Sequence, residues 1–158
     1  MFDRQSWLSL LPFILACFAA AVIGAATIRQ SVKTWYSTLH RPAWTPPGRI
    51  FTFVWTTLYL MMAFSAWLIW RNAPWPDARP ALILFAIQLV LNALWSILFF
   101  GLRRVGPAYA EILLLFTMII ATITAFLPLS FLAAWLLLPY AVWVAFASYL
   151  NFRIWQLN

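Results

Sequence analysis

The chain has 158 residues, of which 66% are hydrophobic and only 8% charged, and its mean hydropathy is +0.91. Typical soluble domains carry roughly 25% charged residues, so this composition excludes a water-soluble globular protein. The net charge of +7 does not indicate nucleic acid binding, because the Lys and Arg residues stand in short gaps between apolar runs, as topology signals of membrane proteins do. Cys17 is the single cysteine, so disulfides are excluded and a packing role is expected for it.

Long apolar runs predict five membrane-spanning helices. An α-helix needs about 20 apolar residues to cross the hydrocarbon core, and such runs lie at residues 7–28, 50–70, 81–102, 108–127 and 131–155. The first run is too long for the core of a cleaved signal peptide, so we expect it to be retained. Pro128 and Ser130 separate the last two runs. The expected fold class is all-α: an integral membrane bundle of five transmembrane helices, forming one domain over residues 1–158.

The connections between these spans are rich in prolines. Residues 29–49 form a first connection that also contains Trp35 and Trp44. A connection of that length in a compact bundle is commonly functional, and prolines reduce the entropy lost when a loop is ordered, so we expect a lid over a pocket. The prolines within residues 71–80 predict a second, short loop, because proline disrupts a helix interior.

The basic residues are unevenly divided between the two sides of the membrane. The N-terminal side has Arg4, Arg71 and Arg79. The other side has Arg29, Lys33, Arg41, Arg49, Arg103, Arg104 and Arg153. The positive-inside rule therefore predicts that the first loop and the C-terminus are cytoplasmic and that the N-terminus is outside. A helical bundle of this polarity fits an inner membrane better than an outer one.

Three of the expected spans carry a polar and aromatic stripe along one helix face. The stripes are Thr52, Trp55, Thr56 and Tyr59; Gln88, Asn92, Trp95 and Ser96; and Tyr140, Trp143, Ala147 and Asn151. Polar groups inside a membrane protein face the bundle interior or a cavity. The pattern leaves two interpretations open, namely hydrogen bonds between helices or a cavity for a flat, largely apolar ligand. The other two spans have weaker stripes and are expected to be structural.

The ionisable residues indicate no standard catalytic or metal site. Glu111 is expected near the start of the fourth span, where a carboxylate interacts favourably with a helix N-terminus; a proton-relay role is the alternative. His40, the one histidine, is expected to be a solvated loop residue, with axial haem ligation as the alternative. No carboxylate pair, Ser/His/Asp set or Cys/His cluster lies within a stripe. We therefore expect no catalytic residues of these classes, no metal site and no obligatory cofactor.

Several motifs resemble the TspO/MBR family of tryptophan-rich sensory proteins and translocator proteins. The motifs are Trp35-Tyr36, Arg41-Pro42-Ala43-Trp44-Thr45-Pro46-Pro47, Val54-Trp55-Thr56-Thr57-Leu58-Tyr59, Gln88 to Ser96, Phe99-Phe100-Gly101, and Pro139-Tyr140 with Trp143, Ala147, Leu150 and Asn151. They occur in order across nearly the whole chain. The resemblance implies a five-helix bundle, often homodimeric, whose pocket is capped by the first loop.

The resemblance also implies a membrane receptor or sensor that binds porphyrins (protoporphyrin IX or haem) and related amphipathic ligands in a pocket inside the bundle. Whether it also transports them is left open. By motif position, it implies a pocket lined by Trp35, Trp55, Tyr59, Asn92, Trp95, Ser96, Trp143 and Ala147. The loop and the stripes add Trp44, Gln88 and Tyr140 to the expected ligand-binding residues. Expected partners are membrane lipid, a porphyrin-type small molecule and a second copy of the chain.

Two alternative functions stay open. Some relatives are reported to degrade protoporphyrin IX in light and oxygen, and by position the tryptophans implicated are Trp55 and Trp143; whether the chain is an enzyme is therefore undecided. The other alternative is passive transport of tetrapyrroles or sterols. Val144, Tyr149 and Arg153 match a loose sterol pattern but depart from the arrangement of the eukaryotic relatives, so sterol binding is not expected.

Overall fold

The computed structural model describes residues 6–158 and consists of helices and their connections. A 3₁₀ turn η1 (Trp7–Leu10) leads into α1 (Leu11–Ser31), and the first loop contains the short turn η2 (Tyr36–Thr38). The remaining elements are α2 (Gly48–Asn72), α3 (Trp75–Ser96), the π-helical turn η3 (Ile97–Gly101), α4 (Val105–Phe126), α5 (Phe131–Leu136) and α6 (Leu138–Leu157). Every described secondary-structure element is helical, which confirms the expected all-α class.

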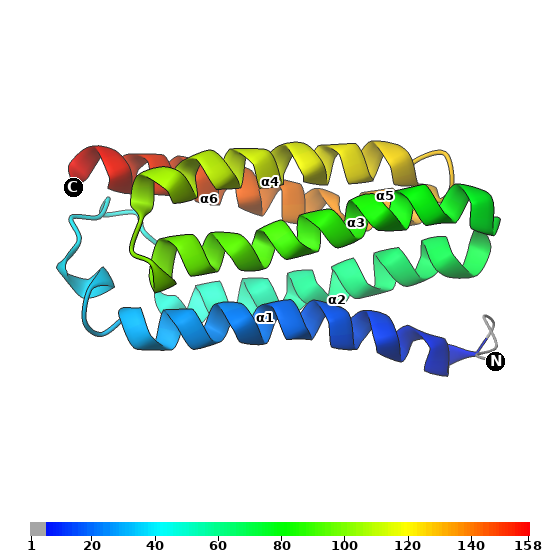
Figure 1. Cartoon of the computed structure of the whole chain (residues 1–158), viewed down its shortest axis with the longest axis horizontal. Helices are drawn as coiled ribbons and strands as arrows, with labels where there is room; N and C mark the ends of the chain where they lie inside the picture. Colours follow the sequence, from blue (N-terminus) through cyan, green and yellow to red (C-terminus); the bar gives the residue numbers. More distant parts are fainter. Residues whose placement is uncertain (1–5) are drawn as a thin grey trace.

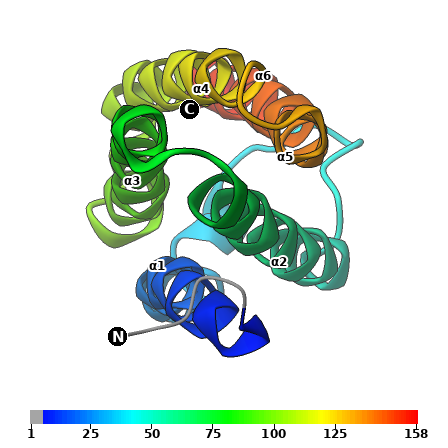
Figure 2. The ribbon, with the colours of Figure 1, turned by 90° about the vertical axis from the view of Figure 1, so that its right-hand side faces the viewer.

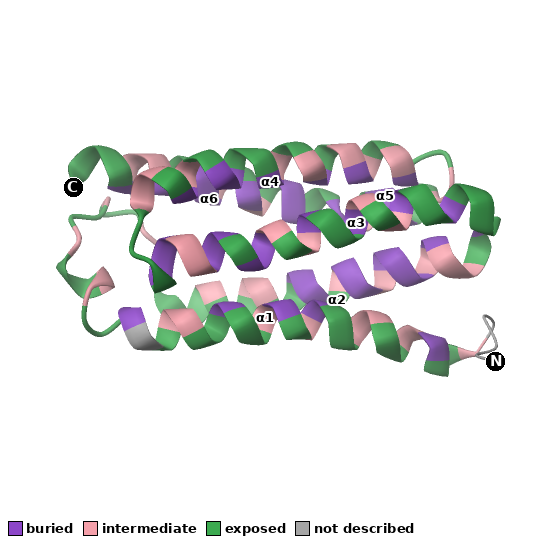
Figure 3. Ribbon diagram, viewed as in Figure 1, coloured by how far each residue is buried: buried purple, intermediate pink, exposed green. Residues whose placement is uncertain are grey.

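These helices provide five candidate membrane spans. The spans are Trp7–Arg29, Gly48–Asn72, Trp75–Gly101, Val105–Phe126 and Phe131–Leu157. All five lie side by side, and an odd number of spans puts the described N-terminal end opposite the C-terminus and the first loop (Figure 1). Exposed residues cover much of the outer faces, above all on α1 (Figure 3), as expected for surfaces that contact lipid tails rather than water.

Seen along its length, the bundle is a ring of helices (Figure 2). Helix α1 packs between α2 and α3, α3 continues the ring to α4, and α4 packs on α6. Helix α5 closes the ring against α2, where the Ser65 hydroxyl donates to the Ala133 carbonyl at 2.7 Å. At the loop end the ring encloses the space described below.

The second connection lies where it was predicted but is limited to residues 73–74, so the predicted bounds of 71–80 were too wide. Helix α3 already begins at Trp75. Pro76 is its second residue, where the missing N–H would have no helical partner in any case. Pro80 lies inside the helix but close to its start, so the carbonyl that it leaves unbonded is near the helix end.

The other span ends differ from the expected ones by smaller amounts. The first loop covers residues 32–47 rather than 29–49, because α1 continues through Ser31 and α2 begins at Gly48. The last span is broken at Leu137 into α5 and α6. Pro139 is the second residue of α6, and without an N–H it cannot carry the α-helical ladder across the break.

The π-helical turn widens the end of α3 and is tied to α1. The Ser31 hydroxyl donates to the Phe100 carbonyl at 2.5 Å, and the Thr27 hydroxyl reaches the Ser96 carbonyl at 3.3 Å. A π-turn shifts the helical register by one residue and is frequent at functional sites. Here it places Phe99 and Phe100, adjacent in sequence, at the wall of one cavity.

Candidate ligand-binding cavity

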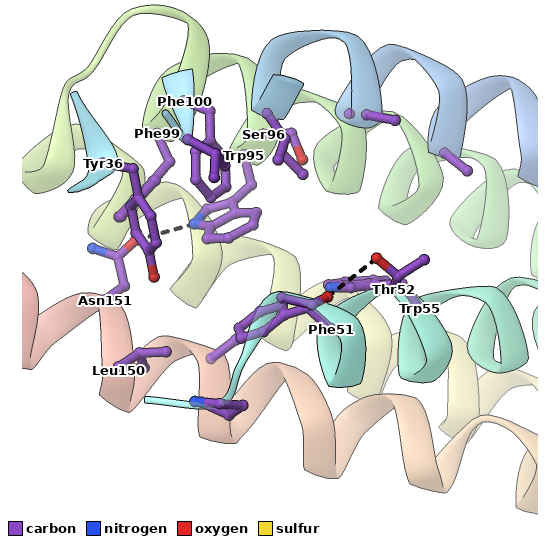
Figure 4. Close-up of a pocket in the computed structure, with 18 of the residues that line it drawn as sticks. Tyr36, Phe51, Thr52, Trp55, Trp95, Ser96, Phe99, Phe100, Leu150 and Asn151 are labelled. Atoms are coloured by element: carbon purple, nitrogen blue, oxygen red, sulfur yellow. Dashed lines mark hydrogen bonds between the residues drawn. The ribbon is translucent and has the colours of Figure 1, made fainter. Parts of the chain in front are cut away.

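A cavity of about 480 Å³ lies inside the loop end of the bundle (Figure 4). Its walls come from α1, the first loop, α2, α3, η3 and α6, while α4 and α5 contribute no described residue to the lining. The volume falls in the range of about 300–1,000 Å³ that is usual for small-molecule sites. The space is therefore large enough for an organic ligand, and it is bounded mainly by apolar and aromatic side chains.

A chain of buried hydrogen bonds forms the floor of the cavity. The Tyr59 hydroxyl donates to Asn92 Oδ1 at 2.5 Å, and Asn92 Nδ2 donates to the Tyr140 hydroxyl at 2.9 Å. The Tyr140 hydroxyl in turn donates to Gln88 Oε1 at 2.9 Å. Tyr59 and Asn92 line the cavity, whereas Tyr140 and Gln88 lie behind them. The chain joins α2, α3 and α6 and fixes the orientation of the two lining residues.

Trp95 presents an indole ring whose position is set by hydrogen bonds and stacking. Its Nε1 donates to Asn151 Oδ1 at 3.1 Å, and Asn151 Nδ2 donates to the Val105 carbonyl at 3.0 Å. The ring also stacks on Phe99, with centroids 5.4 Å apart. Both polar groups of Asn151 are thus used within the protein, and the Trp95 ring is held beside the cavity before any ligand arrives (Figure 4).

The opposite wall is formed by α2, whose lining residues alternate aromatic rings and threonines. Phe51, Thr52, Trp55 and Thr56 all line the cavity. The Thr52 hydroxyl donates to the Gly48 carbonyl at 3.1 Å, and the Thr56 hydroxyl donates to the Thr52 carbonyl at 2.8 Å. Because these hydroxyl protons are used within the helix, the wall offers Trp55 and Phe51 as its main ligand surfaces.

Helix α1 supplies a third wall, which the sequence did not predict. Its lining residues are Phe18, Ala21, Gly24, Ala25 and Ile28, with Val32 just beyond the helix. A Cβ on Gly24 would lie 3.0 Å from the Ser96 hydroxyl oxygen, so glycine permits the close approach of α1 and α3. The first span was expected to be more structural than the spans with stripes, and its contribution to the lining was missed because small apolar residues form no polar stripe.

Residues of the first loop line the cavity at its loop end, and the role of the loop as a lid stays a prediction. Tyr36, Ser37, Arg41 and the segment Thr45–Pro47 belong to the lining. Arg41 is the one charged residue among the described residues that line the cavity. Its guanidinium lies 4.6 Å from the centroid of the Tyr36 ring, and Tyr36 packs on Phe100 with centroids 5.4 Å apart.

Six of the predicted ligand-binding residues line this cavity. They are Trp55, Tyr59, Asn92, Trp95, Ser96 and Ala147. The others lie outside the lining: besides Gln88 and Tyr140, Trp35 packs edge-on against Phe99 at 5.8 Å, and the half-exposed Trp44 stacks on Tyr149 at 5.6 Å.

Trp143 also lies outside the lining, behind Phe51, with the two ring centroids 5.3 Å apart. Its indole Nε1 is buried and has no hydrogen-bond partner among the described residues. Of the two tryptophans that the family resemblance implicated in light-dependent chemistry, the cavity is therefore lined by Trp55 alone within the described part of the chain.

The ionisable residues of interest lie away from the lining. Glu111 is the seventh residue of α4, beyond its first turn, and both its carboxyl oxygens are buried without a hydrogen-bond partner in residues 6–158. The expected interaction with the helix N-terminus was therefore wrong, since that effect is confined to the first turn. His40 is exposed in the loop and does not line the cavity. Arg4 lies outside the described residues.

Metal binding finds no support in the described residues. Within them, no group of three or more His, Cys, Asp or Glu side chains is placed to hold a metal ion. Cys17 is buried and free, and it packs in the apolar core. The groups that the cavity presents to a ligand include aromatic ring surfaces, the Asn92 amide, the Tyr59 and Ser96 hydroxyls, and the Arg41 guanidinium at the loop.

Sequence comparisons agree with this architecture. The model of the TspO/MBR family matches residues 13–156. The chain is 40% identical over 154 residues to the translocator protein of Ovis aries, covering 96% of this chain and 91% of that protein. It is 42% identical over 151 residues to the tryptophan-rich protein TspO of Archaeoglobus fulgidus, covering 96% and 97%. Identity to the tryptophan-rich sensory protein of Cereibacter sphaeroides is 36% over 155 residues, covering 98% and 94%. The chain is an integral, multi-pass membrane protein that belongs to the TspO/MBR family.

Proposed function

We propose that the chain is a membrane receptor or sensor that binds a porphyrin, such as protoporphyrin IX or haem, in the cavity at the loop end. The observation that carries the proposal is the composition of its lining. Trp55 and Trp95 face the space from two helices, Asn92 and Ser96 are among its polar groups, and Arg41 lies at the loop. A flat aromatic macrocycle with acidic substituents matches this distribution of groups.

The chemistry of each group suits a different part of such a ligand. Indole rings offer large apolar faces that favour stacked or edge-to-face arrangements with other aromatic systems. An arginine beside a carboxylate forms charge-assisted hydrogen bonds, which are about twice as strong as neutral ones. We therefore expect the macrocycle between α2 and α3, with its carboxylates directed toward Arg41.

The first test is a titration of the purified protein with protoporphyrin IX, followed by quenching of tryptophan fluorescence. Trp55→Leu should weaken binding by about tenfold or more, since one good aromatic contact contributes about 0.5–1.5 kcal/mol beyond its buried area. Trp75→Leu is the matched control, because Trp75 is half exposed at the start of α3, outside the lining. Absence of saturable quenching, or equal weakening by the two changes, would refute the proposal.

The second test addresses the role of Arg41. Arg41→Gln should weaken binding of the free diacid by about tenfold to a hundredfold, in line with a charged hydrogen bond of about 1.5–3 kcal/mol, and should leave binding of the dimethyl ester unaffected. Arg49→Gln serves as the control, since Arg49 is a nearby exposed cation outside the lining. Equal loss for diacid and ester would mean that Arg41 acts through the loop structure and not through its charge.

Movement of the ligand across the bilayer is the second part of the proposal. Relatives of this chain carry the name translocator protein. The seven basic residues at the loop end, against Arg71 and Arg79 at the other described end, favour a cytoplasmic loop. Flux of protoporphyrin IX between liposomes, measured with wild type and Trp55→Leu, separates transport from binding alone. Flux equal to that of protein-free liposomes would refute transport of the ligand by this protein.

Light- and oxygen-dependent porphyrin breakdown is a second candidate, favoured by the position of Trp55 in the lining. An indole in contact with an excited macrocycle is an oxidisable neighbour. Illumination of the aerated complex would then yield a new absorbing product, and Trp55→Phe would reduce it. If the spectrum of the illuminated complex bleaches as fast as that of free porphyrin, with no new band, this candidate is excluded.

A further inference from the structure

The side chain of Asn158 ties the first loop to the end of α6. Its Oδ1 accepts from the His40 main-chain N–H at 3.0 Å, and its Nδ2 donates to the His40 carbonyl at 3.0 Å. The same Nδ2 donates to the Ile154 carbonyl at 2.8 Å. The Asn158 amide thus bonds to both the N–H and the carbonyl of His40, 118 positions away in sequence. Its bond to the Ile154 carbonyl holds the same amide against the end of α6.

This contact lies between two hydrogen-bonded turns of the loop. One turn precedes it, closed by the bond from Thr38 N–H to the Trp35 carbonyl at 3.0 Å, and another follows, closed by Thr45 N–H to the Pro42 carbonyl at 3.0 Å. His40 lies between these turns, and its main-chain groups bond to Asn158. The main chain of the segment that joins the two turns is therefore bonded to a residue outside the loop.

The residues on either side of the contact belong to the cavity. Arg41, the next residue after His40, lines it, and so does Ile154, whose carbonyl anchors the Asn158 side chain. From the cavity side, Arg41 rests on the Tyr36 ring at 4.6 Å. Asn158 and Tyr36 thus hold the Arg41 segment from two directions, although Asn158 itself lies outside the lining.

We propose that Asn158 is a positioning residue that keeps the loop closed over the cavity and sets the rate of ligand exchange. The inference rests on the proposed porphyrin-binding function. The bonds between Asn158 and His40 are exposed, so water replaces them when they break, and opening at such a contact is inexpensive compared with opening of the helical core. When the hydrogen bonds between Asn158 and His40 break, the loop moves away from the cavity and Arg41 loses its contact with the ligand.

The test combines two measurements on the full-length protein in detergent. Amide hydrogen exchange of residues 32–47, without ligand, reports whether Asn158 holds the loop. Stopped-flow release of protoporphyrin IX reports whether this contact controls exchange. Asn158→Ala should accelerate amide exchange at His40 and ligand release by about tenfold each, as expected for the loss of two exposed hydrogen bonds. Association should be faster as well, so that the equilibrium affinity changes less than either rate.

Two further variants make the test specific. Asn158→Asp keeps the acceptor for the His40 N–H but loses the donor to its carbonyl, so its release rate should fall between those of wild type and Asn158→Ala. Gln156→Ala is the control in the same helical turn. The Gln156 side chain accepts a hydrogen bond from Arg153 at 2.9 Å and makes none to the loop within residues 6–158, so its rates should match wild type.

The outcomes separate this inference from the proposed function. Unchanged amide exchange at His40 in Asn158→Ala, or faster amide exchange with unchanged ligand release, overturns the inference while leaving porphyrin binding intact. If the wild type shows no saturable binding, the proposed function fails and the positioning role fails with it. Amide exchange would still decide in that case whether Asn158 fixes the loop.

Discussion

Tyr140→Phe tests whether the buried hydrogen-bond chain stabilises the bundle. The Tyr140 hydroxyl accepts from Asn92 Nδ2 and donates to Gln88 Oε1, each at 2.9 Å, so the change removes both bonds and leaves the ring in place. Gln88 Nε2 is already buried without a hydrogen-bond partner in the described residues. In the variant, neither the oxygen nor the nitrogen of the Gln88 side-chain amide therefore has a hydrogen-bond partner among residues 6–158.

The expected loss follows from the number of bonds removed. Interhelical side-chain hydrogen bonds in membrane proteins contribute about 0.6 kcal/mol on average and at most about 1.7 kcal/mol. Two such bonds correspond to a loss of about 1.2–3.4 kcal/mol in the free energy of unfolding. Tyr59→Phe is the matched comparison, since it removes one bond, to Asn92 Oδ1 at 2.5 Å. It should cost about 0.6–1.7 kcal/mol.

The assay is unfolding in mixed micelles of a mild detergent and sodium dodecyl sulfate, followed by circular dichroism. Tyr149→Phe, at a residue that is 57% exposed, provides the baseline. The reasoning is refuted if Tyr140→Phe costs no more than Tyr59→Phe or than this baseline. A further check is the double variant Gln88→Leu/Tyr140→Phe, which should recover part of the loss, because replacing both partners removes the unsatisfied groups.

Three other changes have defined expected outcomes. Gly24→Val should lower the unfolding free energy by about 1–3 kcal/mol through overpacking, because a Cβ there would lie 3.0 Å from Ser96 Oγ; Gly48→Ala, with nothing within 4 Å, should not. Ala147→Leu should weaken porphyrin binding by about tenfold at an unchanged melting temperature, since it extends a lining residue into the cavity. Glu111→Leu should raise the unfolding free energy by about 1–3 kcal/mol, because it removes a buried carboxyl with no described hydrogen-bond partner; a lower stability in the same micelles would contradict this.

The membrane spans could be predicted from sequence because their physical requirement is simple. A helix must supply about 20 apolar residues to cross the hydrocarbon core, and length and hydropathy alone test for that. The ends of the spans were less predictable, since several are decided by single main-chain groups. Pro80 illustrates this: its ring excludes one hydrogen bond, but its position near the start of α3 lets the helix begin before it.

Helical periodicity also predicted part of the cavity. Thr52, Trp55, Thr56 and Tyr59 all line it, because residues spaced by three and four share one face of a helix. The wall contributed by α1 could not be found in this way. Its alanines and Gly24 look the same in sequence as small residues that pack helices together, and only the positions of α2 and α3 decide that they face a space.

The stripes could not separate residues that line the cavity from residues that support it. Gln88 and Asn92 lie one turn apart on the same face of α3, yet Asn92 lines the cavity and Gln88 bonds to Tyr140 behind it. Both positions require inward polar groups, so periodicity treats them alike, and the difference is one of depth along the bundle. Because Asn92 also holds α3 to α2 and α6, changing it would alter stability and binding together. Trp55 and Arg41, which line the cavity without belonging to the hydrogen-bond chain of its floor, are therefore the sharper probes of ligand binding.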